Sequence, residues 1–356
     1  MKVRYFRKAL FLFPLLIICC SAEGQPPQGK AKPKAPRIDA SLKYNKDGKF
    51  KILQLTDTHV IAGDPRSDRA LQNINAVLDA EKPDFVIHTG DIIYGSPAEE
   101  SLKTALQPLV DRGIPFAVAL GNHDSDFDKT REEVYEIIRS IPGNVNCPRD
   151  VTINGCSNDI LTLSSDGAPD RVIYLFDSGN REYPNGIKSW GYVHWDQVFW
   201  YRNASNYFKA GNGGNPIPSL AFFHIPVPEY RQALIDSSKK ARFLCGNLGE
   251  EPASPLYNPG LFLAFLEQGD VRGIVTGHDH NNDYVMLWRG FFLIYGRYGG
   301  CDTVYNDLKP SGARVFEFTA GESGFRSWIR LSDGRVEQEL TLVPGMKTFS
   351  DLPAVQ

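Results

Sequence analysis

Short apolar runs that end in a polar side chain restrict the fold of this chain more than any other feature. In the first half these runs cover residues 49–55, 84–88 and 115–120, and segments with helical periodicity follow them at 67–81, 101–111 and 130–141. Alternating strands and helices predict parallel strands joined by right-handed crossovers. Ligands of such α/β sheets gather at the carboxyl ends of the strands, so we expect a site where these runs end.

The second half of the chain has more β character. Strands are predicted at 171–176, 219–224 and 273–276, and a helix at 258–268. Beyond residue 284, β-rich runs occupy 284–288, 291–295, 313–318 and 336–342. These runs predict a largely antiparallel second sheet.

Five segments carry side chains that commonly bind metals. They read Asp57-Thr58-His59, Gly90-Asp91-Ile92-Ile93-Tyr94, Gly121-Asn122-His123-Asp124, His224 after an apolar run, and Gly277-His278-Asp279-His280. A single Asp-x-His or Gly-Asp pair is usually a turn. Five of the seven histidines fall inside these segments, however, and their nitrogen and oxygen donors suit zinc, iron or manganese. The other two histidines, His88 and His194, are expected to have structural roles.

This ordered set of motifs, between Phe50 and Phe318, resembles the calcineurin-like metallophosphoesterases, in particular the short single-domain members of their purple-acid-phosphatase-like branch. Three further runs carry the resemblance: Phe222-Phe223-His224-Ile225-Pro226-Val227-Pro228-Glu229, Gly269-Asp270-Val271 and Tyr295-Gly296-Arg297. The resemblance implies an α/β fold, namely a four-layer α/β/β/α sandwich with mixed sheets.

The resemblance also implies a centre of two metal ions, divalent or of mixed valence, made of iron, manganese or zinc. Asp91 is expected to bridge both ions. The first ion would be completed by Asp57, His59 and His280, and the second by Asn122, His224 and His278.

The activity implied is hydrolysis of phosphoric esters, with a phosphomonoesterase as the leading hypothesis and a hydroxide between the two ions as the nucleophile. His123 is expected to bond a phosphoryl oxygen or to protonate the leaving oxygen, with Asp124 orienting it. Arg297 is a candidate clamp for the phosphate. The alternatives are a phosphodiesterase with the same site and a non-catalytic metal-binding scaffold.

Purple acid phosphatases proper have Asp-x-Gly in the first motif and bind ferric iron through the tyrosine of Gly-Asp-x-x-Tyr. This chain has Asp-x-His together with Tyr94. We expect His59 to bind the metal and Tyr94 to line the pocket or to contact a ligand. His88, on the strand that leads to Asp91, is a candidate for contacting a ligand.

The aromatic cluster of Trp190-Gly191-Tyr192 and Trp195 either stacks on substrate or belongs to the core.

The net charge is −3, and no long basic stretch is interleaved with aromatic residues, which argues against a nucleic-acid groove. The expected partner is a phosphorylated substrate of unknown identity.

The N-terminus resembles an export signal. Basic residues precede an apolar stretch at 9–18 that is too short to span a bilayer. We predict a signal peptide at 1–22, a disordered linker at 23–46, the metallophosphoesterase domain at 47–345 and a tail at 346–356. Cys19 or Cys20 lies where a lipoprotein signal carries its lipid, and ordinary cleavage after Ala22 is the alternative. The protein is expected to be exported, either as a periplasmic or cell-surface lipoprotein, which would touch the membrane only through its lipid, or as a secreted enzyme.

Four cysteines remain beyond the signal, and export permits disulfides. Cys147 and Cys156 are nearest in sequence and form the favoured pair. Cys245 and Cys301 would pair or stay free.

Overall fold

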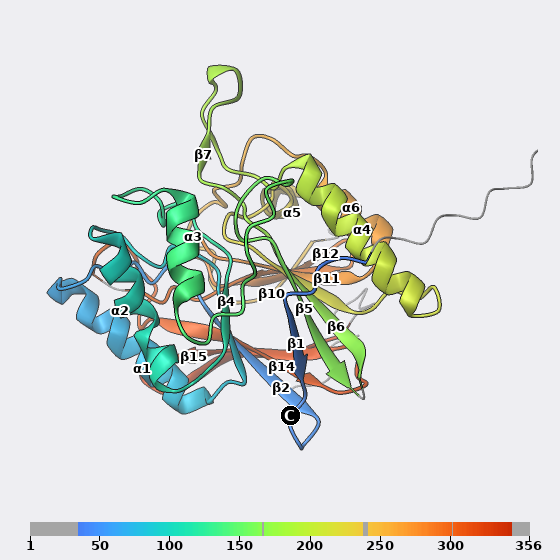
Figure 1. The fold of residues 1–356 in the computed structure, drawn as a ribbon, viewed down its shortest axis with the longest axis horizontal. Coiled ribbons are helices and arrows are strands. Elements are labelled where there is room, and N and C mark those ends of the chain that lie inside the picture. Colours follow the sequence, from blue (N-terminus) through green and yellow to red (C-terminus); the bar gives the residue numbers. More distant parts are fainter. Residues whose placement is uncertain (1–34, 166, 238–240, 301, 344–356) are drawn as a thin grey trace, which may run out of the picture. The chain divides into compact units, whose positions relative to one another are not determined.

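Two β-sheets form the centre of the computed structural model, which describes residues 35–165, 167–237, 241–300 and 302–343 (Figure 1). The six-stranded sheet has the order β16-β15-β14-β2-β3-β4. Its bounds are β2 Lys49–Leu55, β3 Phe85–His88, β4 Phe116–Val118, β14 Gly312–Thr319, β15 Phe325–Leu331 and β16 Val336–Leu342. Strands β2, β3 and β4 are parallel, as the alternation of apolar and helical segments predicts.

The eight-stranded sheet has the order β1-β5-β6-β9-β11-β13-β12-β10. Its bounds are β1 Ala40–Lys43, β5 Asp159–Ser165, β6 Ala168–Leu175, β9 Ser219–Phe222, β10 Arg242–Cys245, β11 Val271–Thr276, β12 Val285–Trp288 and β13 Phe291–Tyr295. Strands β6, β9, β11 and β13 are parallel, while β12 runs antiparallel to β13. Both sheets are therefore mixed.

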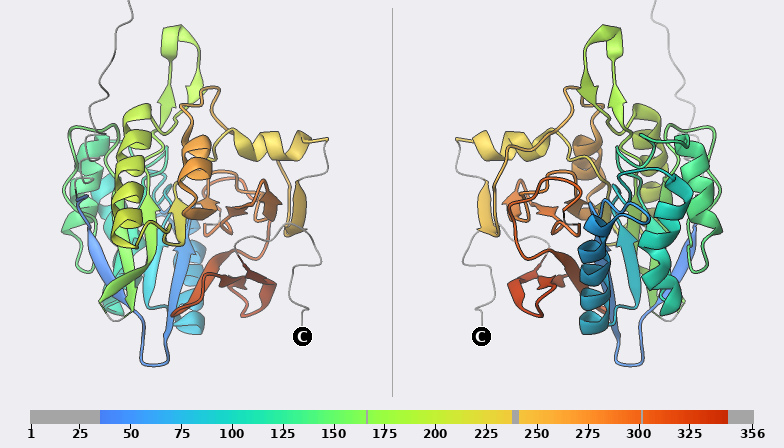
Figure 2. Two further views of the ribbon diagram at one scale, coloured as in Figure 1. Left: turned by 90° about the vertical axis from the view of Figure 1, so that its right-hand side faces the viewer. Right: turned by 90° about the vertical axis from the view of Figure 1, so that its left-hand side faces the viewer.

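Helices cover the outer face of each sheet. The six α-helices of the described residues are α1 Asp68–Glu81, α2 Ala98–Asp111, α3 Arg131–Ser140, α4 Trp195–Gly211, α5 Glu229–Ile235 and α6 Leu261–Gln268. Helices α1, α2 and α3 share a buried apolar cluster with the six-stranded sheet, and α4, α5 and α6 share another with the eight-stranded sheet. The two views of Figure 2 look onto these two helical sides.

The alternation of side chains along a strand explains this layering. Phe50 and Ile52 of β2 point into a third apolar cluster, which fills the space between the sheets, whereas Leu53 and Leu55 point towards the helices. Successive strand residues face opposite sides, so a strand buried on both faces is apolar throughout. Each such buried side chain contributes about 1.5–3 kcal/mol. The predicted α/β/β/α sandwich is confirmed.

The C-terminal strands differ from the prediction of a separate antiparallel sheet. Strands β12 and β13 belong to the eight-stranded sheet, while β14, β15 and β16 extend the six-stranded sheet through the antiparallel pairing of β14 with β2. Antiparallel pairing does not require a second sheet, because a strand can add to the free edge of a parallel one.

The predicted linker at 23–46 is wrong at its C-terminal end. Strand β1 pairs in parallel with β5, and Asp39 accepts a hydrogen bond from the backbone N–H of Ile160 at 2.6 Å. The folded part therefore begins before residue 47. The predicted signal peptide at 1–22 and the tail at 346–356 lie outside the described residues.

The favoured disulfide between Cys147 and Cys156 is also wrong, since both are free thiols. Their environments differ: Asp39 approaches the thiol of Cys147, whereas the backbone N–H of Cys156 donates to Asp177 at 2.6 Å. Cys245 is free, and Cys301 lies outside the described residues. Among the described helices, none is long and apolar enough to cross a membrane.

Candidate metal centre

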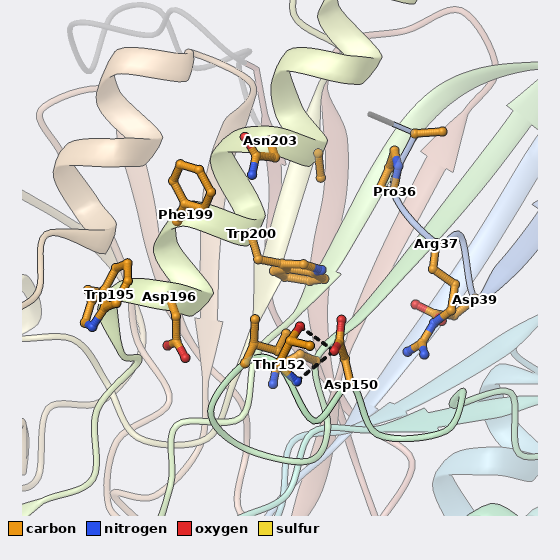
Figure 3. A pocket seen from close by; sticks show the side chains of 14 residues that line it. Pro36, Arg37, Asp39, Asp150, Thr152, Trp195, Asp196, Phe199, Trp200 and Asn203 are labelled. Carbon is orange, nitrogen blue, oxygen red and sulfur yellow. Dashed lines mark hydrogen bonds and ion pairs between the residues drawn. The ribbon is translucent and has the colours of Figure 1, made fainter. Parts of the chain in front are cut away.

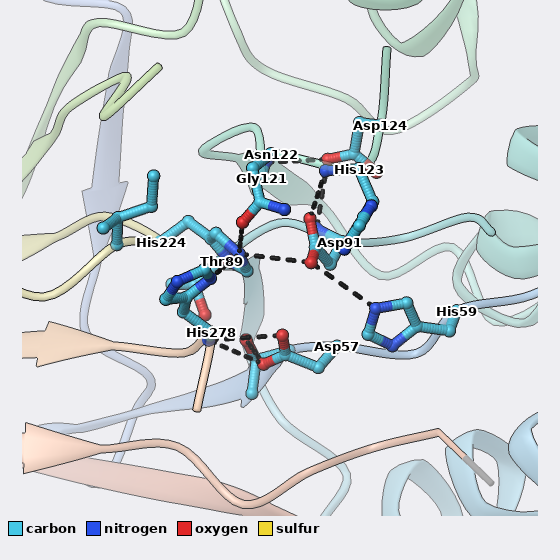
Figure 4. Close-up of polar contacts among 12 residues, drawn as sticks. Asp57, His59, Thr89, Asp91, Gly121, Asn122, His123, Asp124, His224 and His278 are labelled. Carbon is cyan, nitrogen blue, oxygen red and sulfur yellow. Dashed lines mark hydrogen bonds and ion pairs between the residues drawn. The ribbon is translucent and has the colours of Figure 1, made fainter. Parts of the chain in front are cut away.

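The predicted ligands lie at the carboxyl ends of strands from both sheets (Figure 4). Two groups of carboxylates and imidazoles form there, and within each group the ligand atoms lie within 4.8 Å of one another. The first group contains Asp57, His59, Asp91 and His280, and the second contains Asp91, His224 and His278. Asp91 is common to both, which is the position that a bridging carboxylate requires.

Asn122 joins the second group. Its Oδ1 atom lies 3.0 Å from Nε2 of His224, and that same nitrogen lies 3.3 Å from Oδ2 of Asp91. The structure thus brings together all seven side chains that the sequence predicted as ligands.

Backbone carbonyls accept a hydrogen bond from Nδ1 of two of the imidazoles, which leaves Nε2 of each ring to bind a cation. Nδ1 of His224 donates to the carbonyl of Thr89 at 2.7 Å, and Nδ1 of His280 donates to the carbonyl of Tyr305 at 2.9 Å. The Nε2 atoms therefore face the carboxylates. A bond of this kind fixes the orientation of a metal-binding histidine.

Several buried polar atoms in the centre lack a hydrogen bond. Both ring nitrogens of His59 and Nε2 of His278 have no hydrogen bond among the described residues, although Nε2 of His59 lies 3.4 Å from Oδ2 of Asp91. Such atoms are costly to bury unless something binds them. Imidazole nitrogens that lack a hydrogen bond and lie beside carboxylate oxygens are suitable ligands for transition-metal ions. The residues therefore suit the metals that the family resemblance implies.

The electrostatics show how strongly the centre attracts positive charge. Burial raises the pKa of Asp91, but His224 and His59 outweigh it and hold that pKa well below its usual value. Burial lowers the pKa of His224, yet the charge of Asp91 outweighs burial and raises the pKa to about 9. In the metal-free protein a proton on His224 thus neutralises Asp91.

The backbone at the centre is strained. Four of the ligand residues have a positive φ although none is glycine: 53° at Asp57, 48° at His59, 53° at Asp91 and 76° at His278. A left-handed conformation costs an ordinary residue about 1–2 kcal/mol. Strain of this kind gathers at functional sites, where the surrounding fold enforces it.

Neighbouring glycines allow the loops to approach closely. A Cβ atom on Gly277 would lie 2.0 Å from Oγ1 of Thr56 and 2.6 Å from Oδ2 of Asp57. A Cβ atom on Gly121 would lie 2.2 Å from Oδ1 of Asp91. The glycines are therefore needed for space beside the carboxylates.

His123 lies at the rim, with 20% of its side chain exposed. Its Nδ1 is 2.7 Å from Oδ2 of Asp126, so Asp126 orients the ring. The prediction that Asp124 does so is wrong: its buried carboxylate accepts the backbone N–H groups of Asp91, Ile92 and Gly121 at 3.1, 2.7 and 2.7 Å. Asp124 shapes the loops instead. The only sequence signal for Asp126 was its place three residues after His123.

Of the two side chains proposed to contact ligands, Tyr94 packs against one of them, whereas the contact of His88 is with Thr58, which is not a predicted ligand. The ring of Tyr94 packs edge-on against His59 and His123, with ring centroids 5.4 and 4.9 Å apart. Nε2 of His88 lies 3.0 Å from Oγ1 of Thr58, the residue between Asp57 and His59. Burial and the charge of His224 lower the pKa of His88 to about 3, so it is neutral.

Arg297 does not occupy the position of a phosphate clamp. Its buried guanidinium donates to Asp283 at 2.5 Å and to the carbonyl of Pro310 at 2.7 Å. Both bonds are internal to the fold, which makes a clamping role for this side chain wrong.

The predicted aromatic cluster is divided. Trp190 packs edge-on against His278 with ring centroids 4.5 Å apart, whereas Tyr192 stacks on His194 at 4.4 Å. Trp195 is 71% exposed and lines a separate cavity of about 860 Å³ together with Phe199 (Figure 3). Only Trp190 reaches the centre.

Comparison with known proteins agrees with this geometry. The model of the calcineurin-like phosphoesterase family matches residues 50–282. The chain therefore belongs to the calcineurin-like phosphoesterases, a family that implies a phosphoester as substrate. Within the family its similarity is to purple-acid-phosphatase-like proteins.

Three similar relatives come from plants and yeast. Two Arabidopsis thaliana proteins, named probable inactive purple acid phosphatases 14 and 29, are each 31% identical over 290 residues and cover 71% and 72% of this chain and 71% and 73% of their own. The phosphatase DCR2 of Saccharomyces cerevisiae is 31% identical over 333 residues, which are 82% of this chain and 55% of that protein.

Solved structures share the fold. A dimetal phosphatase from Danio rerio matches with a TM-score of 0.58 at 15% identity, covering 83% of this chain and 99% of that one. A protein described as the anchor in the inner membrane complex of Plasmodium matches with a TM-score of 0.53 at 14% identity, covering 86% and 95%.

Proposed function

We propose that the chain is a metal-dependent phosphomonoesterase. The observation that carries this proposal is the partly exposed pair of His123 and Asp126 beside two donor groups that share Asp91. A protein that only bound metals would need the donor groups but not a histidine held at their rim.

Each part of the centre has a task in ester hydrolysis. Asp57, His59 and His280 would hold one ion, Asn122, His224 and His278 the other, and Asp91 both. When bound, the two ions supply positive charge that neutralises the phosphoryl oxygens and activates water.

His123 acts on the substrate directly. The carboxylate of Asp126 accepts a hydrogen bond from Nδ1–H and so directs Nε2, on the opposite side of the ring, away from it. When both ring nitrogens carry a proton, Nε2–H donates a hydrogen bond to a phosphoryl oxygen, or transfers its proton to the leaving oxygen and leaves the neutral imidazole with its proton on Nδ1. General acid help of this kind typically contributes about 10²–10⁴-fold to the rate. The backbone N–H of His123 also donates to Asp91 at 2.8 Å, so His123 is held next to the expected bridging ligand.

A non-catalytic metal-binding scaffold is the second candidate. The names of the two Arabidopsis relatives, both called probable inactive, favour it. The description of the Plasmodium protein as an anchor also favours it. Loss of catalysis would be compatible with intact metal binding.

One experiment separates the two functions. Purified protein would be loaded with iron, manganese or zinc, its metal content measured, and its turnover followed on phosphomonoesters and phosphodiesters. We expect two metals per chain and preferred hydrolysis of monoesters, with turnover lost in His123→Ala while both metals remain. Two metals without turnover of any ester would make the protein a scaffold, and preferred diester hydrolysis would make it a phosphodiesterase.

We also propose that the enzyme is exported and tethered by a lipid on Cys20 or Cys19. The basic and apolar residues at its N-terminus support this proposal. Mass spectrometry of the mature N-terminus tests it: a lipidated cysteine is expected, and an unmodified chain starting at Glu23 would contradict the tether.

A further inference from the structure

Tyr305 is an exposed aromatic side chain beside a metal ligand. Its ring stacks on His280 with ring centroids 4.5 Å apart and an interplanar angle of 30°. Nε2 of His280 in turn lies 3.7 Å from Oδ1 of Asp57 in the first donor group. Tyr305 nevertheless remains 56% exposed, so the ring offers surface to solvent one imidazole away from a cation site.

Three contacts hold this ring in place. Besides the stacking on His280, the hydroxyl of Tyr305 donates to Oε2 of Glu250 at 3.0 Å, and its backbone carbonyl accepts Nδ1–H of His280 at 2.9 Å. Glu250 is itself fixed, because Oε1 accepts the backbone N–H of Asn281 at 2.7 Å. A side chain that is already ordered loses little conformational entropy when a ligand covers it.

The charge around the ring is negative. Glu250 accepts the hydrogen bond of the Tyr305 hydroxyl, and Asp307 accepts one from the side-chain amide of Asn281. Among the described residues, neither carboxylate has a salt bridge to a lysine or arginine. A ligand that lies over Tyr305 and carries a second phosphate would meet these carboxylates. Like charges brought together in this way disfavour binding.

We propose that Tyr305 is the surface on which the leaving group of the substrate stacks, and that the substrates are monoesters of aromatic alcohols without a second phosphate. This inference rests on the proposed phosphomonoesterase function. Hydrolysis would break the bond between phosphorus and the aryl oxygen, form a bond from phosphorus to the oxygen of water, and release a phenol and inorganic phosphate. An offset or tilted stack of two rings adds stabilisation beyond the area that it buries.

Binding of two stable phosphonates tests whether Tyr305 is this stacking platform, and it does not require turnover. Phenylphosphonate carries the ring and methylphosphonate does not, so calorimetric titration of the metal-loaded protein with both separates the ring from the phosphate site. In Tyr305→Ala we expect binding of phenylphosphonate to weaken roughly two- to tenfold and binding of methylphosphonate to stay unchanged. Tyr305→Phe keeps the ring and should retain the affinity.

The side-chain variants leave the carbonyl of Tyr305 in place, so the bond that orients His280 survives in each of them. Phe199→Ala is a matched control, because Phe199 is 60% exposed but lies on α4 at the separate cavity. Loss of metal in Tyr305→Ala, equal weakening of both phosphonates, or no change in either would each overturn the platform. If the ring preference holds but no ester is hydrolysed, the platform stands and the phosphatase function fails.

A second titration tests the exclusion of further charge. Benzene-1,4-diphosphonate adds one phosphonate to the ring and should bind more weakly than phenylphosphonate. Glu250→Gln, which keeps an acceptor for the hydroxyl of Tyr305, should narrow that difference. Equal binding of both ligands to the unaltered protein would refute the exclusion.

Discussion

Replacing Asp126 by alanine is the most direct test of how His123 is held. The variant removes the carboxylate 2.7 Å from Nδ1 of His123 and leaves all seven predicted metal ligands in place. Without it, the ring of His123 is free to rotate. The orientation that points Nε2 at the phosphoryl group is then populated only part of the time.

The size of the effect follows from the bond that is lost. A hydrogen bond to a charged group is worth about 1.5–3 kcal/mol. The side chains of His123 and Asp126 are 20% and 26% exposed, so solvent screening favours the lower end of that range. Since each 1.4 kcal/mol is about a factor of ten in rate, we expect kcat to fall about tenfold.

The assay is kcat on a fixed phosphomonoester, together with metal analysis of every variant. Asn180→Ala is the matched control, because Asn180 bonds the other oxygen of Asp126 at 2.9 Å and leaves the contact with His123 intact. Asp126→Asn keeps one acceptor oxygen and should recover part of the rate. Full activity in Asp126→Ala, or a rate loss that follows loss of metal, would refute the orienting role.

Three other measurements test the centre and the fold. Asp91→Ala should reduce bound metal to one ion or none, because the shared carboxylate serves both donor groups; two ions with near-native turnover would contradict the bridge. Tyr94→Phe should change activity only modestly, and the oxidised protein should lack a strong visible tyrosinate band, whereas a purple colour lost in this variant would make Tyr94 a ligand of iron. Burial, with the charge of Asp39 adding to it, raises the pKa of Asp159 to about 7, so its contribution to stability is present below about pH 4 and is lost as the pH rises through about 7. Between about pH 4 and 7, the free energy of unfolding measured in urea should fall less in Asp159→Asn than in the unaltered protein. An equal fall in both proteins would refute this prediction.

The local part of the site could be predicted from sequence. Strands β2, β3 and β4 are continuous apolar runs, and the residues that follow them in the chain must lie at one edge of a parallel sheet. Asp57, Asp91 and Asn122 therefore had to be neighbours. The four histidines predicted as ligands followed from the same reasoning and the family resemblance.

What depends on side-chain direction within a loop could not be predicted. Asp124 and Asp126 are both close to His123 in sequence, and only the turn of the loop sends Asp124 inwards to the backbone and Asp126 outwards to the ring. Arg297 likewise seemed free until the fold placed Asp283 beside it. Strand β1, Ala40–Lys43, escaped prediction because it is only four residues long and lies at the edge of its sheet.

The contacts of the metal centre join parts of the chain that are far apart in sequence. The backbone N–H of His278 reaches Asp57 across 221 residues, and His224 meets Asn122 across 102. Closing such long loops costs entropy before any contact repays it, and non-local pairings form slowly. We therefore expect the centre to be completed late in folding, after both sheets have formed. A chain translocated in an unfolded state would bring no ions with it, and the compartment in which it folds would decide which metals it holds.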